Sequence, residues 1–246
     1  MSEIAVLEGI VSVRAALESG SRPIHAILIR RDKWDPGIVR LERAARDAGI
    51  RVERVDAAAI DAAAEGTTHG GVIAQVGPRR FESLDTLADG VRAPFVAMLD
   101  GVEDPFNFGQ AMRALYAAGA HGLVVRPRNW LSAAGIVARA SAGASEWMPT
   151  AVAETALDAA AHFRARGLTI ACTAQQGAVS IYEVDLSGPL FLVIGGERRG
   201  ITRSFLEQAD LLLAIPYGRA FDQSLGTTAA AAVLAFEIMR QRAARG

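Results

Sequence analysis

The sequence predicts an α/β protein built around a parallel sheet. Between about residues 93 and 246, five short apolar runs alternate with stretches whose apolar residues recur at helical spacing. Strands that alternate with helices form a parallel sheet covered on both faces, and such buried strands read as continuous apolar runs. Residues 1–78 repeat the alternation on a smaller scale. The chain is 51% hydrophobic and 22% charged, which is typical of a globular protein.

The first block, residues 1–78, predicts a small α/β domain. Ser12 lies near the start of its first helix, and Gly49 follows its second helix, where glycine commonly ends one. The expected elements, in order, are helix 9–17, strand 24–29, helix 38–48, strand 50–55, helix 56–64 and strand 71–76.

Residues 79–92 are predicted to connect two domains. Arg79 and Arg80 follow a proline at the start of this segment, and Gly90 lies near its end. A short helix at 83–88, with Ser83 as its cap, is expected within it.

The second block, residues 93–246, predicts the larger domain. Each of its strands is four to six residues long and strongly apolar, as expected for a strand buried on both faces. The expected strands are 95–99, 122–125, 168–173, 190–194 and 211–215, and the expected helices are 109–118, 133–142, 155–166, 203–208 and 228–242.

Composition excludes several classes of protein. The longest apolar run, 229–236, is far shorter than the roughly 18 residues of a membrane span. No signal peptide is evident, and with Cys172 as the single cysteine we expect a cytoplasmic protein without a disulfide. The four histidines have no ligand spacing, so no metal is expected. A net charge of −1 argues against coating nucleic acid by bulk charge, although local basic patches remain possible.

A polar turn follows the first strand of the second block. It contains Asp104, Asn107 and Gly109, and it opens a helical stretch that contains Arg113. Open α/β sheets bind ligands at the carboxyl ends of their strands, and helix N-termini favour anions. The turn therefore predicts a site for a phosphate or a phosphate ester.

Two further polar turns follow later strands. One is Gly-Gly-Glu-Arg-Arg-Gly at 195–200, and the other runs from Pro216 to Thr228. Glycine allows close approach of the backbone to a ligand. Because all three turns lie at strand carboxyl ends, we expect them to line one crevice.

The order of these turns resembles the SpoU/TrmH-type RNA 2′-O-ribose methyltransferases of the SPOUT superfamily. The motifs are Asp-Pro-x-Asn-x-Gly-x-x-x-Arg at 104–113, Gly-x-Glu-x-x-Gly at 195–200, and Ile-Pro at 215–216 followed by Ser-Leu at 224–225. Residues 7–17 and 68–74 are similar to the first helix and closing segment of the family's small substrate-binding domain.

The resemblance implies a fold, a cofactor and partners. It implies a small L30e-like domain before a catalytic sheet whose C-terminal part forms a deep trefoil knot. It also implies S-adenosyl-L-methionine (S-adenosylmethionine) as cofactor, structured RNA (rRNA or tRNA) as substrate, and a homodimer.

The resemblance assigns catalytic roles to four residues. Arg113 would hold the RNA phosphate or activate the ribose hydroxyl, and Asn107 would orient Arg113 or the ribose. Glu197 would orient Arg113 or the loop that carries the cofactor, and Ser224 would contact the arginine or the cofactor. Each has a plainer interpretation: a surface arginine for Arg113, helix caps for Asn107 and Ser224, and a first-turn glutamate for Glu197.

The resemblance also indicates binding residues. Ile215 and Leu225 are core residues in the plainer interpretation, and the arginines below are then a solvated charged surface. The cofactor candidates are Thr173, Gly195, Gly196, Ile215 and Leu225, and the RNA-binding candidates are Arg30, Arg31, Arg198, Arg199 and Arg219.

The third motif departs from the family pattern. Gly226 stands where the family has asparagine, so one orienting amide is absent, unless Thr227 or Thr228 replaces it. The alternative to an active enzyme is therefore a weakened or inactive RNA-binding homologue. A nucleotide-dependent dehydrogenase is disfavoured, because no G-x-G-x-x-G turn follows the strand at 95–99.

Overall fold

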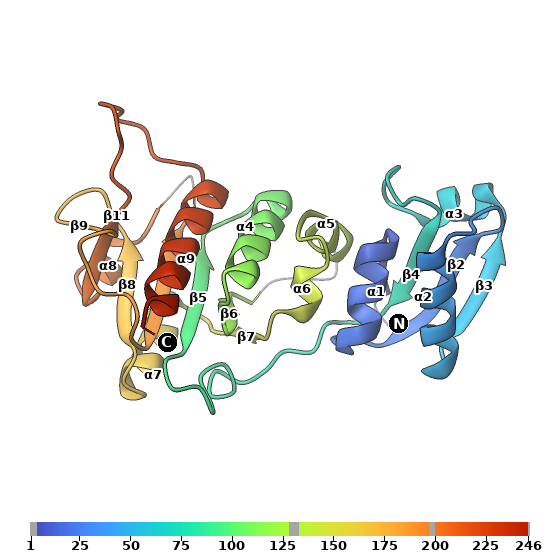
Figure 1. The fold of residues 1–246 in the computed structure, drawn as a ribbon, viewed down its shortest axis with the longest axis horizontal. Helices are drawn as coiled ribbons and strands as arrows, with labels where there is room; N and C mark the ends of the chain where they lie inside the picture. The colour runs from blue at the N-terminus through green and yellow to red at the C-terminus, as the bar shows by residue number, and fades with distance from the viewer. Residues whose placement is uncertain (1–3, 128–132, 197–199, 246) are drawn as a thin grey trace. The chain divides into compact units, whose positions relative to one another are not determined.

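The computed structural model describes residues 4–127, 133–196 and 200–245. The chain divides into two compact units, each with its own sheet (Figure 1). The first unit comprises Met1–Arg80 and Arg128–Trp147, and the second comprises Phe81–Pro127 and Met148–Gly246.

The first unit contains a four-stranded mixed sheet. Its strand order is β1-β4-β2-β3, in which β2 and β3 are parallel and the other pairs are antiparallel. The strands are β1 (Ala5–Glu8), β2 (Ile24–Arg30), β3 (Arg51–Val55) and β4 (Val72–Val76).

Helices complete the first unit around one apolar core. Asp35 caps α2, because its carboxylate accepts hydrogen bonds from the backbone N–H groups of Gly37 and Ile38. Ala134 and Ala138 of α5 join a core that contains Leu7 and Ile27. The helices are α1 (Ile10–Ser19), α2 (Pro36–Asp47), α3 (Ala57–Ala63), α5 (Ala134–Ala140) and α6 (Ala144–Trp147).

The second unit contains a seven-stranded sheet in which every neighbouring pair is parallel. The strand order is β7-β6-β5-β10-β8-β11-β9. The strands are β5 (Phe95–Asp100), β6 (Gly122–Val125), β7 (Thr150–Val152), β8 (Thr169–Thr173), β9 (Val179–Ser180), β10 (Leu190–Gly195) and β11 (Leu211–Ala214).

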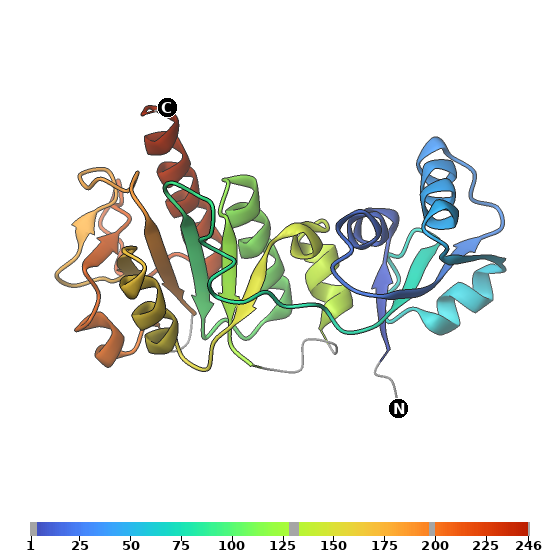
Figure 2. The ribbon, with the colours of Figure 1, turned by 90° about the horizontal axis from the view of Figure 1, so that it is seen from below.

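Helices cover both faces of this sheet (Figure 2). Phe163 of α7 packs with Val96, Met98 and Phe191 on one face. Side chains alternate across a strand, so the residues between these point to the other face, where α4 and α9 pack against each other. The helices are α4 (Pro105–Ala117), α7 (Ala156–Ala165), α8 (Arg203–Leu206) and α9 (Thr227–Ala243).

The predicted fold class is confirmed, with local corrections. The helix expected at 83–88 is wrong: residues 84–90 form turns, although the Ser83 hydroxyl accepts a hydrogen bond from the Thr86 N–H at 3.2 Å. The prediction also missed strands β1, β7 and β9, which have two to four residues each. These strands are short and each contains a polar or charged residue, so none is the continuous apolar run that identifies the strands buried on both faces.

Three further features of the described residues concern membrane-spanning helices, metal-ligating side chains and the single cysteine. Within the described residues, no helix is long and apolar enough to span a bilayer. The same residues contain no group of three or more metal-ligating side chains. Cys172 is buried, and desolvation raises its pKa to about 12, so its thiol stays protonated at neutral pH.

Candidate active site

The carboxyl ends of the central strands bring the three polar turns together. Gly195 at the end of β10 lies opposite Asp100 at the end of β5. Leu213 of β11 lies opposite Thr173 at the end of β8. Because these strands are parallel and neighbouring, the turns that follow them emerge at one edge of the sheet.

The first turn leads directly into α4. Asp104 is the N-cap of this helix, and its carboxylate accepts a hydrogen bond from the Asn107 N–H at 2.7 Å. Pro105 occupies the first helical position, where a missing N–H costs nothing. The plainer interpretation of Asn107 as the cap is therefore wrong, and its half-buried side chain is not needed for capping.

Arg113 lies farther along the same helix. It is six residues after Asn107, so the two Cα atoms are separated by about 9 Å along the helix axis. Its side chain is exposed, and it has no hydrogen bond or ion pair with any other described residue. Arg113 lies four residues after Gly109, so these two residues share one face of α4.

The start of α9 connects the other two turns. The Thr227 hydroxyl donates to the carbonyl oxygen of Gly195, and the Thr228 hydroxyl donates to that of Asn107, both at 3.3 Å. The N-cap of α9 is Gly226, which offers no side-chain capping bond. The interpretation of Ser224 as the cap of this helix is therefore wrong. The two threonines supply contacts to the first and second motifs beside the position of the missing amide.

Glycine at position 196 is required by the protein's own packing. A Cβ atom there would lie 2.1 Å from the carbonyl oxygen of Gly101, which is closer than any real contact. The Gly196 N–H donates to the carbonyl oxygen of Asp100 at 2.7 Å, and the Gly195 N–H donates to the Thr173 hydroxyl at 3.4 Å. These contacts hold the second motif against the ends of β5 and β8.

An ion pair at this edge was missed by the sequence analysis. Arg126 follows β6 directly and donates two hydrogen bonds to the carboxylate of Asp100, at 2.7 and 3.1 Å. The Asp100 side chain is 7% exposed and the Arg126 side chain 39% exposed. In the sequence, Asp100 could have been recognised as an acidic residue at the end of an apolar run. Nothing in the neighbouring sequence indicates that Arg126 is its partner.

The loop after β11 carries the remaining candidates of the third motif. Ile215 and Leu225 are both half-buried, so neither is a plain core residue. The Leu225 N–H donates to the Tyr217 hydroxyl at 3.0 Å, which ties the two ends of the loop together. Arg219 and Ser224 are exposed.

The remaining arginine candidates differ in surroundings. Arg30 forms a bidentate pair with Asp32, and the hydrogen bond and charge of that carboxylate raise the pKa of Arg30. Arg31 lies 3.3 Å from a carboxylate oxygen of Asp56. Both arginines are therefore neutralised in part. Three further predicted residues, Glu197, Arg198 and Arg199, lie outside the described residues.

Comparison with known protein families shows which family carries the three motifs described above. The model of the SpoU rRNA Methylase family matches residues 94–236, which contain all three motifs. The chain belongs to the SpoU rRNA Methylase family. The model for RNA 2′-O ribose methyltransferase substrate binding matches residues 6–82. The predicted family and enzyme class, an RNA 2′-O-methyltransferase, are confirmed, and the inactive alternative is not supported.

Similar proteins cover nearly the whole chain. The 23S rRNA (guanosine-2′-O-)-methyltransferase RlmB of Shewanella oneidensis is 30% identical over 98% of this chain and 99% of its own length. The protein of the same name from Ralstonia nicotianae is 31% identical over 98% of each chain. These matches extend the family assignment across both units.

Solved structures share the fold. The SpoU methyltransferase AviRb from Streptomyces viridochromogenes, in complex with AdoMet, has a TM-score of 0.82 at 22% identity and covers 98% of this chain and 92% of its own. The AdoMet-bound rRNA methyltransferase from Sinorhizobium meliloti has a TM-score of 0.81 at 24% identity, over 97% and 87% of the two chains. The architecture of this chain is therefore that of known SpoU enzymes.

The residues at the sheet edge fit S-adenosylmethionine, which carries both polar and apolar parts. Half-buried Ile215 and Leu225 offer apolar side chains, and Gly195 and Gly196 present backbone without side chains. The Thr173 hydroxyl lies beside them. A mixed lining of backbone and aliphatic groups suits such a ligand.

Proposed function

We propose that this chain transfers the methyl group of S-adenosylmethionine to a ribose 2′-hydroxyl of 23S rRNA. The observation that carries the proposal is the convergence of three family motifs at one edge of the parallel sheet. The names of the relatives that match nearly the whole chain support 23S rRNA, and guanosine as the modified nucleotide.

Different residues of the chain have different roles in methyl transfer. S-adenosylmethionine, when bound, supplies a methyl group on a positively charged sulfur. A guanidinium group offers hydrogen-bond donors and no acceptor, so the role of Arg113 is to hold an RNA phosphate and to hydrogen-bond the ribose oxygen as that oxygen gains negative charge. Asn107 orients the ribose through its amide.

The remaining candidates position these groups. Glu197 and Ser224 orient the cofactor loop and Arg113. The cofactor lies against Thr173, Gly195, Gly196, Ile215 and Leu225, and the RNA contacts Arg30, Arg31, Arg198, Arg199 and Arg219. We also propose that the chain after β10 is threaded as a trefoil knot and that the enzyme works in the cytoplasm.

Replacement of Arg113 tests the function. We expect Arg113→Ala to lower transfer of labelled methyl groups to 23S rRNA by about 1000-fold, because one group that stabilises the transition state is lost. Calorimetry should show unchanged S-adenosylmethionine binding. Arg203→Ala is the matched control, since this exposed arginine belongs to the same unit and pairs with Glu207 on the protein surface. Normal transfer by Arg113→Ala would exclude the assigned role.

We further propose that the enzyme is a homodimer in which α4 and α9 contact a second copy. These helices expose large apolar side chains: Phe106 is 52% exposed, Tyr116 40%, Phe236 44% and Met239 40%. Exposed apolar surface of this kind marks interaction sites. Sedimentation equilibrium should show a dimer for the natural chain and a monomer for Phe236→Glu. A monomeric natural chain with full activity would contradict the dimer.

A further inference from the structure

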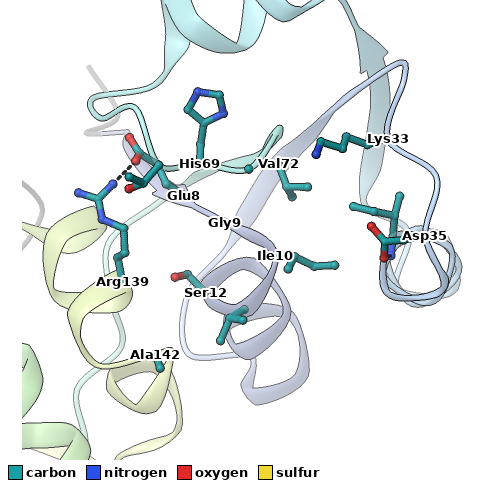
Figure 3. Close-up of a pocket in the computed structure, with 14 residues that line it drawn as sticks. Glu8, Gly9, Ile10, Ser12, Lys33, Asp35, His69, Val72, Arg139 and Ala142 are labelled. Carbon is teal, nitrogen blue, oxygen red and sulfur yellow. Dashed lines mark hydrogen bonds and ion pairs between the residues drawn. The ribbon is translucent and has the colours of Figure 1, made fainter.

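The first unit contains a cavity that the methyl-transfer site does not use. It lies between the N-terminus of α1 and the segment before β4, and its volume is about 400 Å³, within the range of small-ligand sites. Gly9, Ser12, Lys33, His69 and Arg139 are among the residues that line it (Figure 3).

The acidic groups of the cavity are already engaged. Glu8 is 2% exposed, and its carboxylate accepts hydrogen bonds from the N–H groups of Glu65 and Gly66, both at 2.7 Å, and from Arg139. The Asp35 carboxylate caps α2. These acids therefore have little capacity left to bind a cation or a donor.

His69 is engaged in the same way. Its Nδ1 accepts from the Gly71 N–H at 3.1 Å, and its Nε2 lies 3.2 Å from a carboxylate oxygen of Asp61. The imidazole is 10% exposed and held at both nitrogens. It forms a fixed wall of the cavity.

In contrast, two side-chain hydrogen-bond donors that line the cavity have no partner among the described residues. The Ser12 side chain is 2% exposed, yet its hydroxyl has no hydrogen-bond partner in the described part of the chain. Lys33 is half-buried, and its ammonium likewise has no partner within the described ranges. Ser12 lines the cavity and its hydroxyl has no protein partner among the described residues, so this hydroxyl is available to donate to a ligand there.

The backbone adds further donors at the same place. α1 has ten residues, and its N-cap is Gly9, with a φ of +84° and no side chain that could cap the helix. The first N–H groups of a helix have no partner within the helix, and they carry partial positive charge. With Ser12 and Lys33, they form a donor-rich surface that is complementary to an anion.

We propose that this cavity binds one nucleotide of the RNA substrate, with its phosphate against the first turn of α1, Ser12 and Lys33. The apolar side chains of Ile10, Ile38 and Val72 line the rest of the cavity and give the less polar ribose or base a surface to pack on. This proposal rests on the proposed function, since it assigns the cavity to the RNA of that reaction.

Two pairs of variants test the cavity. Lys33→Met removes the ammonium, and Arg43→Met is its control, because the Arg43 side chain is 86% exposed on α2 and outside the cavity. Ser12→Ala removes the open hydroxyl, and Ser19→Ala is its control on the same helix, where the Ser19 hydroxyl bonds the Ala16 carbonyl. In each pair the two substitutions are chemically similar, but only the first replaces a residue that lines the cavity.

Filter binding to protein-free 23S rRNA gives the main readout. Ser12→Ala should weaken binding about tenfold, since a hydrogen bond to a charged group is lost. Lys33→Met should weaken it and reduce the salt slope by about one. Neither control should change. Thermal melting should show that Ser12→Ala is as stable as the natural chain or more so, because alanine favours the helix and removes a buried polar group.

The outcomes separate this proposal from the function itself. Unchanged RNA affinity in Ser12→Ala and Lys33→Met, with normal methyl transfer by the natural chain, would overturn the cavity alone. Weakened binding in both variants, with no methyl transfer by the natural chain, would support the cavity and overturn the function. If Ser12→Ala weakened binding of guanosine monophosphate in calorimetry but not binding of RNA, the cavity would take a free nucleotide and the proposal would be wrong.

Discussion

The polar cluster around Glu146 in the first unit and the sheet edge in the second unit use arginine in opposite ways. Arg22 donates two hydrogen bonds to Glu146, at 2.8 and 2.9 Å, and the two side chains are 5% and 0% exposed. Arg113 lies on α4, the helix that follows the first turn at the sheet edge, and it is exposed and has no partner in the described residues. A closed, buried pair holds a fold together, whereas an open donor is available to a substrate.

The strength of the connections differs in the same way. The Ser21 and Ser145 hydroxyls also donate to Glu146, at 2.5 and 3.2 Å, so the buried carboxylate is fully satisfied. At the sheet edge, single hydroxyl bonds of 3.3 Å link Thr227 and Thr228 to the other motifs. The comparison therefore predicts large stability effects in the first region and smaller ones in the second.

The largest effect is expected for Glu146→Ala. This change leaves the Arg22 guanidinium buried and unpaired, which costs about 4 kcal/mol of unfolding free energy. Urea unfolding measures it. Glu18→Ala is the control, because Glu18 is half exposed and its ion pair with Arg14 spans 3.9 Å. A loss below about 1 kcal/mol would contradict the assigned importance of the pair.

The same pair predicts a dependence on acid. Burial raises the pKa of Glu146, but the charge and hydrogen bonds of Arg22, together with the charge of Arg79 and the hydrogen bond of Ser21, outweigh it, so the pKa is lowered from 4.5. A lowered pKa means that the carboxylate stabilises the fold above the unfolded value, and that this contribution is lost as the pH falls through the folded value. As the pH falls below 4.5, the unfolding free energy of Glu146→Gln should therefore decrease less steeply than that of the natural chain.

Gly196→Ala comes next and probes the sheet edge. Its Cβ would meet the Gly101 carbonyl oxygen at 2.1 Å, and the backbone must shift to relieve the overlap. We expect a loss of about 3 kcal/mol in stability and a loss of S-adenosylmethionine binding, since the second motif is displaced. Gly188→Ala is the matched control, because nothing lies within 4 Å of a Cβ there. Normal cofactor affinity in Gly196→Ala would separate this packing from the cofactor site.

Thr227→Val should have a smaller effect. It removes the hydroxyl bond to the Gly195 carbonyl but keeps the shape of a side chain that is 2% exposed. The expected loss is about 1 kcal/mol, the usual net contribution of one hydrogen bond. Thermal unfolding measures the loss, and methyl transfer shows whether the contact also positions the site. Stability equal to that of the natural chain would show that the bond contributes nothing.

Gly226→Asn should have the smallest effect on stability. Position 226 is the N-cap of α9, with φ −58° and ψ 148°, which asparagine adopts without strain. Asparagine caps a helix better than glycine by only a few tenths of a kcal/mol. The variant also restores the family's amide, so we expect methyl transfer to rise. A fall in transfer with unchanged stability would show that Thr227 and Thr228 have already replaced the amide.

Much of the sheet could be predicted because its strands are buried on both faces. Strands such as Gly122–Val125 are continuous apolar runs bounded by polar turns, so local sequence identifies them. The three motifs follow these strands, so the order of strands and turns predicted that the motifs lie at one edge of the sheet. The short strands β1 and β9 could not be found, because β1 ends in the charged residue Glu8 and β9 has only two residues, so neither is a continuous apolar run between polar turns.

The sequence by itself determined the α/β class, the main strands and the family of this protein, because each depends on local pattern or on motifs in order. Only the tertiary structure decided which partners these residues meet. The pair of Asp100 with Arg126, the contact of Gly196 with Gly101 and the open hydroxyl of Ser12 all depend on segments distant in sequence. The physical reason is that periodicity reports which residues are buried, whereas pairing is fixed by the packing of whole elements.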